Sequence, residues 1–132
     1  MYELQCIVVT PEKTVVERTA DFVAVTLFDG EIGIAPGRTP MIGRLGSGEM
    51  RMRLGAKTER YYVEGGFVEV VGDVVSVLTA RAIPAGELDE AVVQEELDSA
   101  RTRPANTPEL MTARERAVSQ SRARLRVARR AK

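Results

Sequence analysis

Residues 29–41 read Asp-Gly-Glu-Ile-Gly-Ile-Ala-Pro-Gly-Arg-Thr-Pro-Met, and this stretch sets the character of the N-terminal part of the chain. Its two prolines lack a backbone donor and its three glycines favour turns, so the stretch cannot form a helix. It predicts a short strand at 31–35 that opens into a stiff Pro-Gly turn. Such a loop either presents a fixed surface to a partner or serves only the fold, and its residues alone leave both interpretations open.

The residues on both sides of this loop alternate between apolar and polar, which is typical of half-buried strands. Met50 and Met52, for example, alternate with Glu49 and Arg51 before Gly55-Ala56, which fits a two-residue hairpin turn. We expect strands at 3–9, 14–18, 21–27, 31–35, 49–54, 57–63, 67–71 and 74–80. Short strands separated by turn residues predict an antiparallel β-sandwich or barrel over residues 1–84.

The pattern changes after the break at Ile83-Pro84-Ala85-Gly86. From Glu87 the apolar residues follow a helical period, and acidic residues occupy the first turn, where the helix dipole favours them. A second helix is expected from Thr107, a good N-cap, with Pro108 at the first helical position and an end near Arg130. The sequence therefore predicts an α+β fold with two domains: the sandwich at 1–84 and an antiparallel two-helix hairpin at 85–132.

The apolar seam of the second helix is narrow and poor in large side chains. Alanine and serine bury little area, so we expect the hairpin to rest weakly on the sandwich or on itself. Weak packing suits a conformational switch, but it is equally the property of a frayed terminus. The residues of the seam are Leu110, Ala113, Ala117, Ser121, Leu125 and Ala128.

The formal net charge is zero, yet the charges are unevenly distributed. Residues 85–104 carry two basic and six acidic residues, whereas residues 105–132 carry eight basic and two acidic ones. A basic helix can bind nucleic acid phosphates, an acidic membrane surface or an acidic protein, or it can simply be a solvated face. The arginines that carry this prediction are Arg114, Arg116, Arg122, Arg124, Arg126, Arg129 and Arg130.

Enzymatic chemistry has no support in the sequence. The chain contains no histidine, so histidine-activated nucleophiles are excluded, and its single cysteine, Cys6, is expected to be a buried structural thiol. Gly43, Gly46 and Gly48 are not followed by the Lys-Ser/Thr of a P-loop. We therefore expect no catalytic residue, no metal site and no cofactor, and no apolar run is long enough to span a membrane.

Three motifs resemble one family. Residues 30–41, Gly-Glu-Ile-Gly-Ile-Ala-Pro-Gly-Arg-Thr-Pro-Met, are similar to the GELGILPGHAPL loop of the ε subunit of F-type ATP synthases. Residues 63–70, Val-Glu-Gly-Gly-Phe-Val-Glu-Val, are similar to the family's VSGGFLEV hairpin, and residues 7–13, Ile-Val-Val-Thr-Pro-Glu-Lys, to its IVTPEK opening. The motifs lie in family order at family spacing, so the resemblance spans nearly the whole chain.

The resemblance implies a non-catalytic rotor subunit of the central stalk, which couples proton flow through the c-ring to ATP synthesis and inhibits ATP hydrolysis. The sandwich would lie against the γ subunit and the c-ring, at the cytoplasmic face of the bacterial plasma membrane and without entering the bilayer. The hairpin would fold on the sandwich or extend toward the catalytic α and β subunits, whose acidic loops would meet the arginines named above. The expected rotor interface is Glu31, Ile32, Gly33, Pro36, Gly37, Arg38, Pro40 and Met41.

Two departures from the family pattern affect these expectations. Arg38 stands where the family loop usually has histidine, so this contact would be charged at every pH. Some bacterial members bind ATP through an Ile/Leu-Asp-x-x-Arg-Ala motif, of which Leu88 and Asp89 remain here while Val92 replaces the arginine. We therefore expect weak or no ATP binding. The alternative function is a free-standing adaptor with a nucleic-acid-binding tail; under the family interpretation no nucleic acid partner is expected.

Overall fold

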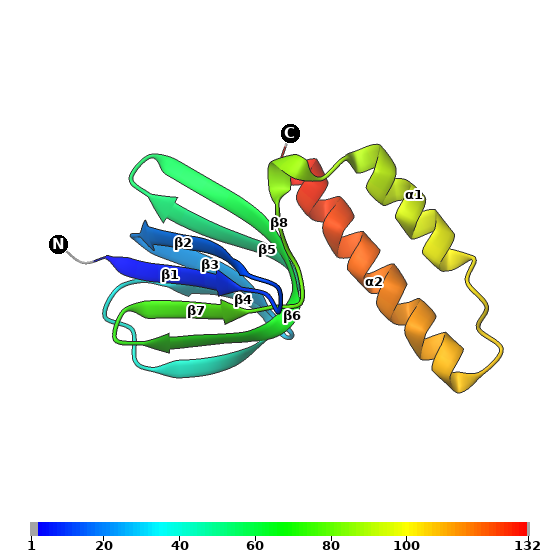
Figure 1. The fold of residues 1–132 in the computed structure, drawn as a ribbon, viewed down its shortest axis with the longest axis horizontal. Helices are drawn as coiled ribbons and strands as arrows, with labels where there is room; N and C mark the ends of the chain where they lie inside the picture. The colour runs from blue at the N-terminus through cyan, green and yellow to red at the C-terminus, as the bar shows by residue number, and fades with distance from the viewer. Residues whose placement is uncertain (1–2, 132) are drawn as a thin grey trace.

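The computed structural model describes residues 3–131, which form a β-sandwich with a helical hairpin projecting from one end (Figure 1). The strands are β1 (Leu4–Val9), β2 (Thr14–Ala20), β3 (Phe22–Leu27), β4 (Gly30–Ile34), β5 (Met41–Leu54), β6 (Lys57–Val71), β7 (Val74–Leu78) and β8 (Ala82–Pro84). A single 3₁₀ turn, Ala85–Glu87, leads into α1 (Glu90–Arg101) and α2 (Pro108–Arg130). The predicted succession of sandwich and helical hairpin is confirmed.

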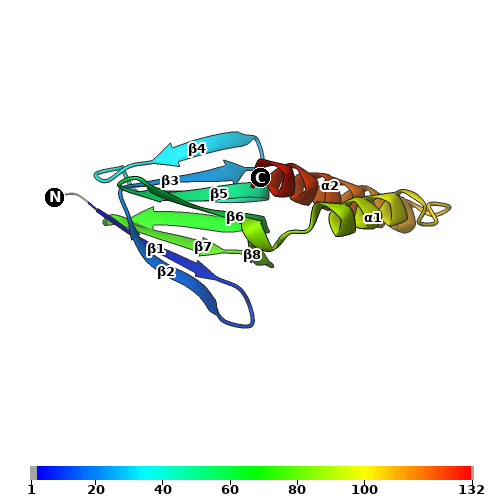
Figure 2. The same cartoon turned by 90° about the horizontal axis from the view of Figure 1, so that it is seen from above.

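The strands form one hydrogen-bonded path in the order β2-β1-β7-β6-β5-β3-β4, and β8 pairs with β6. β5 and β6 are 14 and 15 residues long, and the path folds over into two layers (Figure 2). The sequence predicted shorter strands here, with 57–63 and 67–71 separate, because Gly65 and Gly66 interrupt the pattern although the pairing continues through them. Among the described strands the pairing is antiparallel as predicted, with the exception that β1 and β7 pair in parallel.

The core between the two layers is almost entirely aliphatic. Leu4, Cys6 and Val8 of β1 are fully buried against residues of β3, β5, β6 and β7 such as Met50 and Val68. Burial raises the pKa of the Cys6 thiol to about 12, so the group is neutral and packs as a small apolar side chain. The sandwich is therefore held together by the burial of apolar area.

Two glycines allow backbone approaches that no larger residue would permit. Gly66 has a φ of +102°, and a Cβ there would lie 1.8 Å from the carbonyl oxygen of Leu78. A Cβ on Gly48 would lie 2.8 Å from the hydroxyl of Thr26, which itself donates to the carbonyl of Glu49. The glycines of β5 therefore serve close packing between strands rather than binding of a phosphate.

Both helices begin at the kind of residue that satisfies free backbone donors. Asp89 accepts hydrogen bonds from the amides of Ala91 and Val92, at 2.9 and 3.2 Å, so α1 starts after it and not at Glu87. Thr107 accepts from the amide of Leu110 at 3.1 Å, and α2 starts at Pro108 as predicted. The helices pack against each other along Val93, Leu97 and Leu125.

The last part of α2 lies against the bend of β5 and β6 (Figure 1). Every buried residue of α2 lies at Ser121 or beyond, whereas Leu110 and Met111 near its start are exposed. The predicted seam is therefore a packing face only in its C-terminal half, at Ser121, Leu125 and Ala128. The first half of α2, including Leu110 and Ala113, projects away from the sandwich.

Candidate functional site

The predicted rotor loop is anchored at the turn between β6 and β7. The amide of Gly37 donates to the carboxylate of Asp73 at 2.7 Å, and Arg38 donates to the sulfur of Met41 at 3.2 Å. Gly37, Arg38 and Pro40 are exposed and Pro36 is half-buried. These residues, with Met41 at the start of β5, form one stiff surface.

The other members of the predicted rotor set lie apart from this surface. Glu31 is at the opposite end of β4, where its strand pairs with Thr26, and both line a cavity beneath α2. Ile32 packs against the sandwich core, and Gly33 is exposed beside the ring of Phe22, which would lie 2.6 Å from a Cβ there. The set that the sequence grouped together is therefore divided between two ends of one strand.

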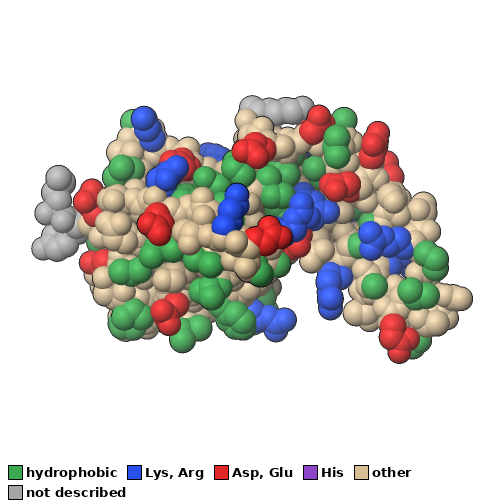
Figure 3. Space-filling model, in the orientation of Figure 1, with side chains coloured by type: hydrophobic (Ala, Val, Ile, Leu, Met, Phe, Trp, Pro, Cys, Tyr) green, Lys and Arg blue, Asp and Glu red, His purple; other side chains and the backbone are tan. Residues whose placement is uncertain are grey.

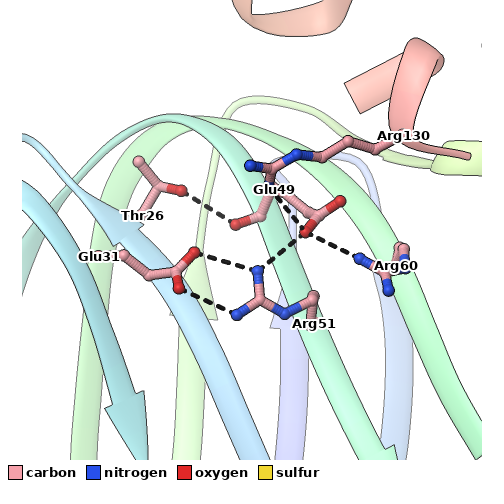
Figure 4. Close-up of polar contacts among 6 residues, drawn as sticks. All are labelled: Thr26, Glu31, Glu49, Arg51, Arg60 and Arg130. Carbon is pink, nitrogen blue, oxygen red and sulfur yellow. Dashed lines mark hydrogen bonds and ion pairs between the residues drawn. The ribbon is translucent and has the colours of Figure 1, made fainter. Parts of the chain in front are cut away.

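Glu31 is held by Arg51 through two hydrogen bonds of 2.9 and 3.1 Å (Figure 4). The hydrogen bonds from Arg51 lower the pKa of the Glu31 carboxyl below its usual range. In turn, the hydrogen bonds that Arg51 donates to Glu31 and Glu49 raise the pKa of Arg51. Glu31 is thus ionised and paired within its own chain, on the side of the sandwich that faces the hairpin.

Arg51 also links Glu31 to a buried carboxylate. The Glu49 side chain is only 3% exposed, and its carboxylate forms ion pairs with Arg51 at 3.0 Å and Arg60 at 3.2 Å. A third ion pair, at 3.5 Å, comes from Arg130 at the end of α2 (Figure 4). The alternation of β5 had placed Glu49 on the polar face of a half-buried strand. That face is instead covered by α2, so Glu49 is buried beneath the helix.

A second carboxylate contacts α2 at Arg124, six residues before Arg130. Glu64 of β6 accepts a hydrogen bond from the Arg124 guanidinium at 3.0 Å and another from the Tyr62 hydroxyl at 2.8 Å. Arg124 also donates to Ser121 at 3.1 Å and lies over the Tyr62 ring, 5.7 Å from its centroid. Burial, and then the bond to Glu64, raise the pKa of Tyr62. The cluster joins the helix to the sandwich in a largely buried setting.

The seven arginines predicted to contact a partner therefore fall into two groups. Arg124, Arg129 and Arg130 form ion pairs with Glu64, Glu90 and Glu49 of the same chain. Within residues 3–131, the remaining four form no ion pair, and Figure 3 shows Lys and Arg side chains along the hairpin and at its junction with the sandwich. These four free arginines are Arg114, Arg116, Arg122 and Arg126.

Three of the free arginines line a groove between the helices. Arg114, Arg122 and Arg126 of α2 meet Arg101 of α1 around an open groove of about 650 Å³, in which Glu115 is the acidic lining residue. Such a concentration of guanidinium groups attracts carboxylates or phosphates. Four arginines against one glutamate make the groove basic, and all its lining residues belong to the two helices.

The remnant of the ATP-binding motif has structural roles in this chain. Leu88 packs in both apolar clusters of the hairpin, and Asp89 is the N-cap of α1. Val92 is exposed beside a groove whose lining includes three glutamates as well as three arginines. The basic member closest to the helix interface, Arg124, is already paired with Glu64. This surface has no excess of positive charge with which to hold a triphosphate.

Sequence reasoning missed Glu49, Glu64 and Tyr62 as residues of the junction. Nothing in the alternation of β5 distinguishes Glu49 from its solvated neighbours. Glu64 could have been found, because it stands where the quoted family hairpin has serine. Among the described residues, no group of three or more potential ligands could hold a metal ion, and no helix is long and apolar enough to cross a bilayer.

The chain is thus a β-sandwich followed by a helical hairpin whose second helix is basic. Residues 3–85 match the profile of the family described as ATP synthase, Delta/Epsilon chain, beta-sandwich domain. The chain is 48% identical to the ATP synthase epsilon chain of Rhodopirellula baltica over 126 residues, covering 96% of this chain and 98% of that one. It is 34% identical to that of Syntrophobacter fumaroxidans, covering 92% of each chain.

Solved structures have the same fold. A chain of the Euglena gracilis mitochondrial ATP synthase superposes with a TM-score of 0.84 at 20% identity, covering 93% of this chain and 79% of that one. A chain of the Tetrahymena thermophila mitochondrial ATP synthase central stalk and c-ring superposes with a TM-score of 0.73 at 13% identity, covering 95% of this chain and 96% of that one. The chain belongs to the delta/epsilon family of ATP synthase subunits.

Proposed function

We propose that this chain is a non-catalytic subunit of an ATP synthase central stalk, peripheral to the cytoplasmic face of a bacterial plasma membrane. Its sandwich couples the c-ring, driven by proton flow, to the γ subunit, and its hairpin restrains ATP hydrolysis in the catalytic head. The observation that carries the proposal is the attachment of the hairpin: among the described residues, the buried ones of α2 all lie at Ser121 or beyond, and α2 packs against β5 and β6. A helix held at one end can detach without unfolding the sandwich.

An apolar surface on the outer face of the sheet fits the γ subunit. Ile42, Phe67 and Leu78 are 73%, 56% and 54% exposed, and they lie on adjacent strands with Phe67 directly opposite Leu78. Neighbouring large apolar side chains at a surface mark a contact with another protein. The stiff loop at 36–41 is the proposed contact with the c-ring, whereas Glu31, paired with Arg51, belongs to the junction with the hairpin.

The free arginines of α2 fit acidic loops of the catalytic β subunits. Arg114, Arg116, Arg122 and Arg126 have no internal partner among the described residues, and three of them converge on one groove with Arg101. An acidic peptide segment in that groove would form bidentate pairs with several guanidinium groups. Arg124, Arg129 and Arg130 become available only when the hairpin leaves the sandwich and opens.

The test is ATP hydrolysis by an ATP synthase head depleted of this subunit, after the full chain or residues 1–86 are added back. A third preparation is the full chain with Arg114→Gln and Arg122→Gln. Its matched control carries Arg18→Gln and Lys57→Gln, which remove the same charge from exposed positions on the sandwich. We expect the full chain and the control variant to suppress ATP hydrolysis and residues 1–86 to have no effect. The arginine variant is expected to suppress hydrolysis several-fold less than the full chain does.

Equal suppression by the full chain and by residues 1–86 would contradict the role of the hairpin. Equal suppression by the arginine variant and its control would contradict the role of the groove. Binding of each chain to the depleted head is measured in parallel, so that a loss of inhibition is not confused with a loss of assembly.

A further inference from the structure

The hairpin is joined to the sandwich by very little apolar surface. The shared cluster consists of the buried residues Tyr62, Ala85, Ala123 and Val127 with the partly buried Ile83 and Leu88, and a cavity of about 200 Å³ remains beneath the end of α2. From α2 the buried members are Ala123 and Val127, small side chains that bury little area. Two ion pairs supplement these contacts: Arg124 with Glu64 and, six residues later, Arg130 with Glu49.

We propose that Glu64 and Glu49 form a two-point latch that holds α2 against the sandwich by binding Arg124 and Arg130. The inference rests on the proposed inhibitory function of the hairpin, and it specifies how that function is regulated. An acidic partner that binds these two arginines competes with the chain's own carboxylates. Release of the latch therefore frees Arg124 and Arg130 from the carboxylates of the sandwich.

The first point of the latch is formed in advance on the sandwich. Glu64 also accepts the hydrogen bond from Tyr62 and lies 4.0 Å from the Arg81 guanidinium, and both of these partners belong to the sandwich. Detachment of Arg124 therefore leaves Glu64 with partners and restores its access to water. Because the attraction within a buried ion pair is largely offset by the loss of hydration, such a contact selects a geometry without making it irreversible.

The second point has the same design. Arg51 and Arg60 of the sandwich pair with Glu49 at 3.0 and 3.2 Å, and among the described residues Arg130 is its partner from the helix. The Arg130 side chain is 62% exposed, so its contact is easily exchanged for water or for another carboxylate. One carboxylate oxygen of Glu49 is buried without a hydrogen-bond partner among the described residues. The closed arrangement therefore leaves one hydrogen-bond acceptor of Glu49 unsatisfied.

The arrangement implies an order of events. The free arginines Arg114, Arg122 and Arg126 are accessible while the latch is closed, so an acidic partner meets these first. Arg124 and Arg130 can exchange their internal carboxylates for those of the partner only afterwards. The internal and external contacts of these two arginines exclude each other.

The latch is tested in the full chain by hydrogen exchange of the α2 amides beyond residue 120. Glu64→Gln removes the buried charge, and Glu69→Gln is the matched control, an exposed glutamate on the same strand that forms no ion pair within residues 3–131. Removing one member of a buried pair is strongly destabilising, so we expect Glu64→Gln to accelerate exchange in α2 about tenfold or more. Glu69→Gln is expected to exchange as the unmodified chain does.

The second point is tested on the helix itself. Arg130→Gln is expected to accelerate exchange at the end of α2 by about twofold, since exposed ion pairs contribute little. Its control is Arg122→Gln on the same helix, which has no internal partner among the described residues and should have no effect. Exchange in β1 and β3 must stay unchanged in every variant.

Unchanged α2 exchange in both Glu64→Gln and Arg130→Gln would overturn the latch, as would acceleration that extends equally to the sandwich. Glu64→Gln is then added to the depleted ATP synthase head, where we expect stronger inhibition of hydrolysis than by the unmodified chain. A loosened hairpin with unchanged inhibition would support the latch while counting against the proposed inhibitory function. The two failures are therefore distinguishable.

Discussion

The sandwich and the hairpin of this chain are held together by different interactions. Among residues 3–131, the sandwich core contains 17 buried residues, all apolar except for the thiol of Cys6 and the hydroxyl of Tyr61. In the same part of the chain the hairpin contributes to two clusters of four and three buried residues, and it supplements them with the carboxylate contacts of Arg124 and Arg130. One region is fixed by the burial of apolar area and the other by a few exchangeable contacts.

The difference explains how one small chain can serve as both a rigid link and a movable element. Apolar burial in a closed core is lost only by global unfolding. Ion pairs and a few alanine contacts can be replaced by equivalent contacts with water or with a partner. Unfolding of the sandwich and the hairpin in one cooperative step would contradict this difference. Substitutions in one region that leave the stability of the other region unchanged would support it.

The largest effect is expected from the sandwich core. Met50 is fully buried between the layers, and Met50→Ala removes apolar contacts and leaves a cavity. We expect the free energy of unfolding to fall by about 2–5 kcal/mol, measured by urea denaturation with circular dichroism. Leu54→Ala on the same strand, where the leucine is 47% exposed, is the control and should change it by less than about 0.5 kcal/mol. Similar losses in both variants would contradict the assignment of the core.

A smaller and local effect is expected within the hairpin. Leu97 is buried between α1 and α2, so Leu97→Ala should lower the free energy that holds the two helices together by about 2 kcal/mol. This value is near the lower limit for such substitutions because the thin interface can collapse around the gap. The amides of α1 should exchange faster, while the urea midpoint of the strands stays within the error of the unmodified chain. A fall in that midpoint as large as the effect on α1 would show that the two regions form one cooperative unit.

The fold could be predicted because its determinants are local. Alternating residues predicted the strands, and Thr107-Pro108 predicted the start of α2 at the residue where it is found. The orientation of β1 against β7 could not be predicted, because the apolar alternation is the same in parallel and antiparallel pairs. Nor could the length of β6, since Gly65-Gly66 has the composition of a turn but lies within a continuous strand.

The candidate site was less accessible to prediction because it depends on long-range packing. The arginines of α2 could be singled out by their number, but nothing in their spacing separates Arg124, whose side chain is 9% exposed, from Arg122 on the outer face. Glu49 is buried only because α2 covers it. Glu31 was grouped with the loop at 36–41 by proximity in sequence, although a strand carries it to the other end of the sheet.

The smallest effect concerns the first turn of α1, where the family resemblance and the structure assign different roles to one residue. The resemblance predicts that Asp89 is part of the remnant of a nucleotide-binding motif, yet its carboxylate accepts hydrogen bonds from the amides of Ala91 and Val92. Asp89→Ala should therefore lower the local stability of α1 by about 1 kcal/mol, measured by exchange of those two amides. Asp89→Asn should retain most of that stability, because asparagine is an equally good N-cap without the charge. If Asp89→Asn loosened the helix as much as Asp89→Ala, the charge rather than the cap would be the essential feature, and the residue would have to be reconsidered as part of a binding site on the movable half of the molecule.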